Sequence, residues 1–285
     1  MPSAYAHDRF GEEVLSSLPE DLAATVEKYR NLFSIGLQGP DPFYYYNPLK
    51  KNDMDAFAEV LHRMAGLYFF KRTPVLSEAE LVYMAGFVCH FTLDASCHWY
   101  VTQYMTAKGV THEEIEGEFD RFLLVRNGVD PVRAVKTRHF HPENASARVI
   151  TGLFTRFCEE NGDAAPSPGL SSTKVTEPKV LKSLRGFVRF ESILRCPTDL
   201  KRNVLYWLLR RVGKYDALKG HITNKQEDPA CQESSRGLFS LYTQAVPDAA
   251  ALVSAWFRKD SVNFEQNSLL KYNFLGEKVI MDEED

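Results

Sequence analysis

The histidines of this chain stand at spacings that suit metal binding. His90, Asp94 and His98 follow one another at intervals of four residues, and His112 and Glu116 repeat that interval. Side chains four residues apart lie one turn apart on the same face of an α-helix. Imidazole and carboxylate groups in that arrangement are typical ligands of zinc. Five of the eight histidines are candidates, namely His7, His62, His90, His98 and His112.

The central candidates lie in residues 78–105, which are apolar nearly all round and therefore predict a buried helix. Inside such a helix an unpartnered imidazole or carboxylate costs several kcal/mol. A hydrogen-bonded pair is the simpler interpretation of His90 and Asp94 taken alone. His98 one turn further on, followed by the pair His112 and Glu116, favours metal ligation instead.

The kinds of ligand indicate which metal would bind. Imidazoles with a few carboxylates and no paired thiolates favour zinc, with manganese or iron as alternatives, whereas calcium and magnesium sites are dominated by oxygen. The candidates outnumber what one tetrahedral ion uses, and a bridging carboxylate would let them hold two or three ions. The eight side chains are His7, Asp41, His62, His90, Asp94, His98, His112 and Glu116.

Four segments of the chain carry a resemblance to a known family. MPSAYAHDRFG, IGLQGPDPFYYY, GFVCHFTLDASCHWY and THEEIEGEFD together resemble the bacterial zinc-dependent phospholipase C family. That family shares an all-helical trinuclear zinc fold with the fungal single-strand nucleases. The resemblance covers roughly residues 1–160. It implies an all-α, multi-helix bundle with the metal site in a cleft between core helices.

The resemblance also implies a distribution of ligands over three ions. Secreted members of the family expose an N-terminal tryptophan that binds the third ion, whereas this chain begins Met1-Pro2, so removal of Met1 would offer the amine of Pro2 in its place. The implied sets are Asp41, His62, His90 and Asp94 for the first zinc, His98, His112 and Glu116 for the second, and His7, Asp94 and Pro2 for the third.

These ions predict a phosphodiester hydrolase that activates water towards a phospholipid-like phosphate ester. Asp41 is the predicted general base or water-orienting residue, and the alternative is a metal-activated water with no separate base. Two other functions stay open. One is a zinc-dependent nuclease or nucleotidase acting on single-stranded nucleic acid, and the other is a non-catalytic, zinc-stabilised helical protein.

The rest of the chain predicts a helical organisation in three parts. Residues 1–160 form the zinc-binding helical core, residues 161–179 form a Pro/Ser/Gly-rich connection or lid, and residues 180–285 supply helices that complete the same domain. Unbroken helical patterns run over 18–37, 54–70, 111–128 and 143–161, and further ones over 180–194, 198–212, 232–258 and 261–272.

Composition bounds the partners and the compartment. A net charge of −4 predicts no stable nucleic-acid binding. Five irregularly spaced cysteines, and no evident signal peptide or membrane span, predict a cytoplasmic location. Residues 199–215 predict a basic amphipathic helix. Peripheral contact with an anionic lipid surface explains that helix, but an ordinary bundle helix edged by Lys and Arg stems explains it as well and is favoured.

Some residues near the candidates have plainer interpretations. The aromatic run 43–46 lines a substrate pocket or packs in the core. His139, His141 and His221 match no ligand of the family, so we expect them at the surface or in turns. Four acidic residues, Glu113, Glu114, Glu118 and Asp120, are candidate acceptors for the second ring nitrogen of the ligating histidines. An acidic helix face exposed to solvent is the favoured interpretation of each.

Overall fold

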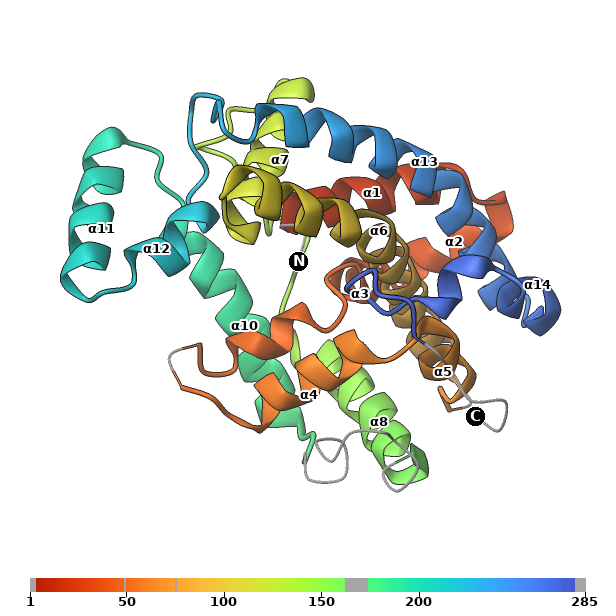
Figure 1. Cartoon of the computed structure of the whole chain (residues 1–285). Helices are drawn as coiled ribbons and strands as arrows, with labels where there is room; N and C mark the ends of the chain where they lie inside the picture. The colour runs from red at the N-terminus through yellow and green to blue at the C-terminus, as the bar shows by residue number, and fades with distance from the viewer. Residues whose placement is uncertain (1–3, 49, 75, 162–173, 280–285) are drawn as a thin grey trace.

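The computed structural model describes residues 4–48, 50–74, 76–161 and 174–279 (Figure 1). Within these ranges the chain is helical, and the only β-type pairing is an isolated bridge between Tyr272 and Lys278. The predicted all-α fold is confirmed. None of the described helices has a stretch long and apolar enough to cross a bilayer.

The predicted buried helix is α6 (Glu78–Lys108), the longest element of the described chain. It begins with a capping box, in which the Ser77 hydroxyl accepts from the backbone N–H of Glu80 and the Glu80 carboxylate accepts from that of Ser77. Gly109 ends it with φ 66°, a left-handed conformation that suits glycine. Because α6 is buried on nearly every side, other helices must surround it.

The surrounding helices come from both halves of the sequence. The N-terminal α1 (Ala4–Ser16), α3 (Arg30–Gly36) and the C-terminal α13 (Gln232–Phe257) all pack on α6 (Figure 1). The approach of α3 is close, since a Cβ on Gly36 would fall 2.1 Å from the carbonyl oxygen of Tyr83. The short η1 (Asp41–Tyr45) follows α3 and packs on α10 (Glu177–Leu194).

The remaining elements complete the shell around this core. The C-terminal helices pack on the N-terminal ones. Most of the predicted connection or lid, residues 162–173, lies outside the described residues. The other bounds are α2 (Glu20–Lys28), α4 (Asp53–Arg63), α5 (Gly66–Lys71), α7 (His112–Arg126), α8 (Asn144–Asn161), α11 (Asp199–Arg211), α12 (Tyr215–Leu218), η2 (Lys219–His221), α14 (Ser261–Glu265) and η3 (Ser268–Lys271).

Two predicted helices are broken where the sequence pattern runs on. The pattern over 18–37 is interrupted at Tyr29, whose backbone leaves the helical region at φ −124° and ψ 35°. The pattern over 54–70 is interrupted at Met64 and Ala65, which are extended. This second break lets the N–H of Gly66 donate to the carbonyl of Tyr272 at 2.8 Å, so a long-range backbone bond replaces a helical one.

Candidate metal centre

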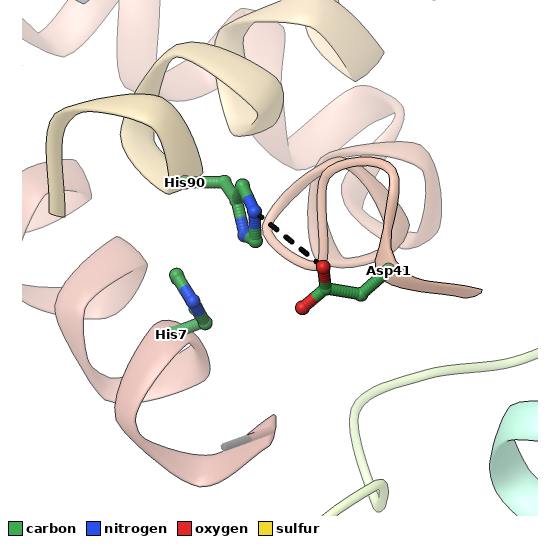
Figure 2. Close-up of side chains that lie close together, drawn as sticks. All are labelled: His7, Asp41 and His90. Carbon is green, nitrogen blue, oxygen red and sulfur yellow. Dashed lines mark ion pairs between the residues drawn. The ribbon is translucent and has the colours of Figure 1, made fainter. Parts of the chain in front are cut away.

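Five elements bring the sequence-predicted ligands to one place. His7 comes from α1, Asp41 from the start of η1, and His62 from the last turn of α4. The middle of α6 contributes three ligands and the first two turns of α7 contribute two. Figure 2 shows the rings of His7 and His90 facing each other from two helices, with the Asp41 carboxylate beside them. All eight described candidates belong to one of three groups whose donor atoms lie within 4.8 Å of one another.

The first cluster surrounds two buried carboxylates. His62 Nε2 lies 3.0 Å from Asp41 Oδ1, and His90 Nε2 lies 3.9 Å from the same oxygen. On its other side, His90 Nε2 lies 3.1 Å from Asp94 Oδ2. The His7 ring stacks on that of His90, with 4.1 Å between centroids, and its Nε2 lies 3.4 Å from Asp94 Oδ1.

The second cluster lies next to the first and shares Asp94 with it. Glu116 Oε1 is 2.5 Å from His112 Nε2 and 3.8 Å from His98 Nε2. His98 Nε2 is also 3.8 Å from Asp94 Oδ1. The two oxygens of Asp94 therefore face three histidines, which is the position that a carboxylate bridging two ions requires.

Several of these buried donor atoms lack a hydrogen-bond partner within the described chain. They include both ring nitrogens of His7 and His98, Nε2 of His90 and both oxygens of Asp94. Leaving such groups unsatisfied in a dry interior is costly, at about 1–3 kcal/mol for each neutral group. A metal ion would satisfy them together, so this donor set fits the ligand set implied by the sequence.

The protonation states also suit metal ligation. Burial and the neighbouring charge of His90 lower the pKa of His7 to about 4, which keeps that imidazole neutral. Burial likewise lowers the pKa of His98. Burial opposes ionisation of Asp94, but the charges of His90 and His98 hold its pKa well below the usual range. Burial disfavours the charged form of His90, but the charges of Asp94 and Asp41 outweigh it and raise the pKa of that imidazole. Neutral imidazoles and ionised carboxylates are the forms that bind zinc, so zinc binding would displace a proton from His90.

Backbone carbonyls, rather than acidic side chains, orient two of the ligand rings. His62 Nδ1 lies 2.8 Å from the carbonyl of Ala58, and His90 Nδ1 lies 3.2 Å from that of Leu37. Each contact turns the opposite nitrogen, Nε2, towards the carboxylates. Glu114 and Glu118 are used elsewhere: Glu114 caps α7 and pairs with Lys219, and Glu118 binds Arg121. The favoured solvent-exposed position is wrong for Glu118, which is buried.

The turn before Asp41 depends on a glycine. Gly39 has φ 50°, and a Cβ there would fall 2.2 Å from Cδ2 of His90. Its missing side chain therefore serves two purposes. It permits a left-handed backbone, and it leaves the space that the His90 ring occupies.

A segment near the C-terminus completes the wall behind the ligands. The N–H of Phe274 donates to the carbonyl of His62 at 3.1 Å. The fully buried Phe274 ring contacts the rings of His62 and His90, with centroids 5.7 and 5.9 Å apart. Sequence reasoning did not find this contact, because nothing in a lone phenylalanine far along the chain signals it.

The second cluster opens into a cavity of about 620 Å³. Asp41, His112 and Glu116 are among the residues that line it, together with three polar residues that sequence reasoning missed. The missed residues are Lys136 from the loop after α7, Glu191 from α10 and His221 from η2.

Lys136 is the centre of that missed group. Its Nζ lies 3.3 Å from Asp120 Oδ2 and 3.4 Å from Glu191 Oε2. Burial disfavours the charged amine, but the two carboxylates raise its pKa above the ordinary value, so it stays protonated. Asp120 in turn accepts from the N–H of Ala6 at 2.9 Å, which ties the start of α1 to the same network.

The histidines expected outside the metal groups do lie outside them, although two are less exposed than predicted. His221 is in a turn as expected, but it borders the cavity and packs on Phe190, and burial lowers its pKa. His139 also lies in a turn as expected, but it is mostly buried and lies 3.2 Å from Asp8. His141 is exposed.

The aromatic run divides between the two expected roles. Phe43 is buried in the core against Phe57. Tyr44 and Tyr45 line the cavity, and the Tyr44 ring stacks on that of His62 with centroids 5.6 Å apart.

Comparison with known proteins found one family whose sequence model matches the first half of the chain. The sequence model described as zinc dependent phospholipase C matches residues 6–161. That stretch contains every candidate ligand from His7 to Glu116. The searches of curated proteins and of solved structures found no match. The C-terminal walls of the cavity, from α10 onwards, lie beyond the matched residues.

Proposed function

This chain belongs to the zinc-dependent phospholipase C family, and we propose that it is a zinc-dependent phosphoric ester hydrolase acting on a phospholipid-like phosphodiester. The observation that carries the proposal is the position of Asp94. It lies between two clusters of imidazoles, with its own oxygens buried and without hydrogen bonds in the described chain. A cavity that can admit a substrate is lined by Asp41, His112 and Glu116 of these clusters.

The proposed ligands are the eight side chains that the structure brings together. Asp41, His62, His90 and Asp94 would hold one zinc, and His98, His112 and Glu116 a second, with His7 available to a third. When bound, the ions would lower the pKa of water and neutralise phosphate charge. Pro2, the proposed amine ligand of the third ion, lies outside the described residues, but Ala4 lines the cavity.

The protein's own groups have distinct parts in the proposed reaction. Asp41 borders the cavity and the first cluster at once, so its carboxylate can orient a water towards the phosphorus and accept its proton. Lys136 also lines the cavity and offers a positive charge there that can attract a phosphate oxygen. Tyr44 and Tyr45 add flat apolar surface to the same cavity, suited to the remainder of the ester.

The test combines metal analysis with a panel of substrates. Purified protein should contain two to three zinc ions and should release p-nitrophenol from p-nitrophenyl phosphorylcholine, with the activity removed by chelation and restored by zinc. Preferential hydrolysis of single-stranded DNA would make the chain a nuclease instead. Bound zinc without turnover on any phosphate ester would leave a metal-stabilised helical protein.

A further inference from the structure

Helix α11 carries apolar side chains that its own packing does not use. Leu200, Val204, Trp207 and Leu208 are 76, 55, 59 and 48% exposed. Their spacing of four, three and one residues places all four on one face of the helix. Large apolar side chains gathered on one exposed face, rather than scattered singly, mark an interaction surface. We call this set the outer face of α11.

The opposite face of α11 already anchors the helix. Leu209 is buried there with Leu194, Cys196 and Ile222, in a small hydrophobic cluster separate from the main core. Figure 1 shows α11 at the edge of the molecule, apart from α6 and next to α12 and α10. Folding therefore accounts for the inner face alone. The inner face packs as an ordinary bundle helix does, and within the described residues no hydrophobic cluster includes the outer face.

The charge around the outer face is mainly positive. Asp199, which pairs with Arg202, and Asp216 flank residues 200–215, and between them the sequence has no Asp or Glu, although the whole chain has a net charge of −4. The guanidinium of Arg211 lies over the Trp207 ring, 5.5 Å from its centroid, and that of Arg210 lies 4.1 Å from the centroid of Tyr215. The basic residues of this stretch are Lys201, Arg202, Arg210, Arg211 and Lys214.

We propose that the outer face of α11 docks on the surface of an anionic lipid bilayer. A tryptophan and aliphatic side chains flanked by Arg and Lys suit the boundary between head groups and acyl chains, where cations meet lipid phosphates. A protein partner would need both negative charge and an apolar surface opposite the outer face. Anionic lipids supply both, because their phosphates are negative and their acyl chains are apolar.

The position of α11 relates the docking surface to the cavity. α11 packs on α12, and α12 packs on η2. Leu218, Gly220 and His221 of these last two elements line the cavity. A docked α11 would bring that wall of the cavity to the lipid surface. This consequence rests on the proposed lipid hydrolase function, whereas the docking itself does not.

The experiment is co-sedimentation of the full chain with vesicles of phosphatidylcholine alone, or of phosphatidylcholine with phosphatidylglycerol. Binding is expected to the second kind and to fall with added salt. The Trp207→Ser/Leu208→Ser variant should bind these vesicles with an affinity reduced by about tenfold or more. The Arg210→Gln/Arg211→Gln variant should lose about fivefold in affinity for these vesicles for each cation removed. Val135→Ser/Val262→Ser, at two equally exposed positions elsewhere, should bind as the unchanged chain does.

Three results would overturn the docking proposal. The first is the absence of binding to vesicles that contain phosphatidylglycerol, and the second is equal binding by the Trp207→Ser/Leu208→Ser variant. The third is a dimer in solution that this variant abolishes, which would assign the outer face to a second copy of the chain. Hydrolysis of water-soluble p-nitrophenyl phosphorylcholine, measured on the same samples, separates the two proposals. Vesicle binding without hydrolysis would support the docking proposal and contradict the proposed hydrolase function.

Discussion

The carboxylate of Asp94 faces the imidazole of His98 one turn further along α6, with 3.8 Å between Oδ1 and Nε2. The same oxygen lies 3.4 Å from His7 Nε2, and the other oxygen lies 3.1 Å from His90. One residue thus links the cluster around Asp41 to the cluster around Glu116. If zinc occupies both clusters, Asp94 is the side chain whose loss affects both.

Replacing Asp94 with Asn should therefore remove more than one zinc equivalent per chain. The amide keeps the shape of the side chain but not the charge that offsets the ions. Zinc content by mass spectrometry checks the prediction. His139→Ala, at a buried histidine outside the three ligand groups, should keep its full zinc content. Full zinc occupancy in Asp94→Asn would exclude the bridging role.

Gly39→Ala should lose zinc and phosphodiesterase activity, because the added methyl would fall on the His90 ring. Gly128→Ala is the matched control, since Gly128 has φ 72° and nothing within 4 Å of an added Cβ. Both variants pay roughly 1–2 kcal/mol for a left-handed alanine. Only Gly39→Ala should change metal content. Equal zinc in the two proteins would show that the ring adjusts.

Lys136→Met should lower the free energy of unfolding by about 3–5 kcal/mol at neutral pH, because it leaves Asp120 and Glu191 buried without their shared cation. The folded-state pKa of Lys136 is raised above its ordinary 10.5. Its contribution to stability is therefore complete below pH 10.5 and is lost as the pH rises towards the folded-state pKa. Urea unfolding of the unchanged chain and of Lys136→Met should show a difference in the free energy of unfolding that becomes smaller above that pH. A difference that does not change with pH would mean that the lost stability comes from packing rather than from charge.

Phe274→Ala should weaken zinc binding as well as stability. The ring packs on His62 and His90, and deleting a buried phenylalanine costs about 3–5 kcal/mol. Leu270→Ala is the control, because Leu270 is equally buried in η3 but belongs to none of the ligand groups. Competition with a zinc chelator should show weaker binding in Phe274→Ala alone. A similar loss of affinity in both variants would trace the effect to general destabilisation.

Local periodicity was enough to predict part of the site. His90, Asp94 and His98 share a face of α6, and His112 and Glu116 share a face of α7, because the α-helix repeats every 3.6 residues whatever surrounds it. The all-α fold and the burial of α6 follow from the same pattern of apolar residues. His7, Asp41 and His62 have no such local signature, and only the resemblance to a family connected them with α6.

Tertiary packing decided what no local pattern contains. The Gly66–Tyr272 backbone bond, and the contact of Phe274 with His62, bring together segments some two hundred residues apart. Lys136 and His221 border the cavity because loops return there, not because of any spacing in the sequence. The period of α11 shows that the helix has two faces, but only the folded chain shows that one of them faces solvent, since burial depends on where distant helices pack.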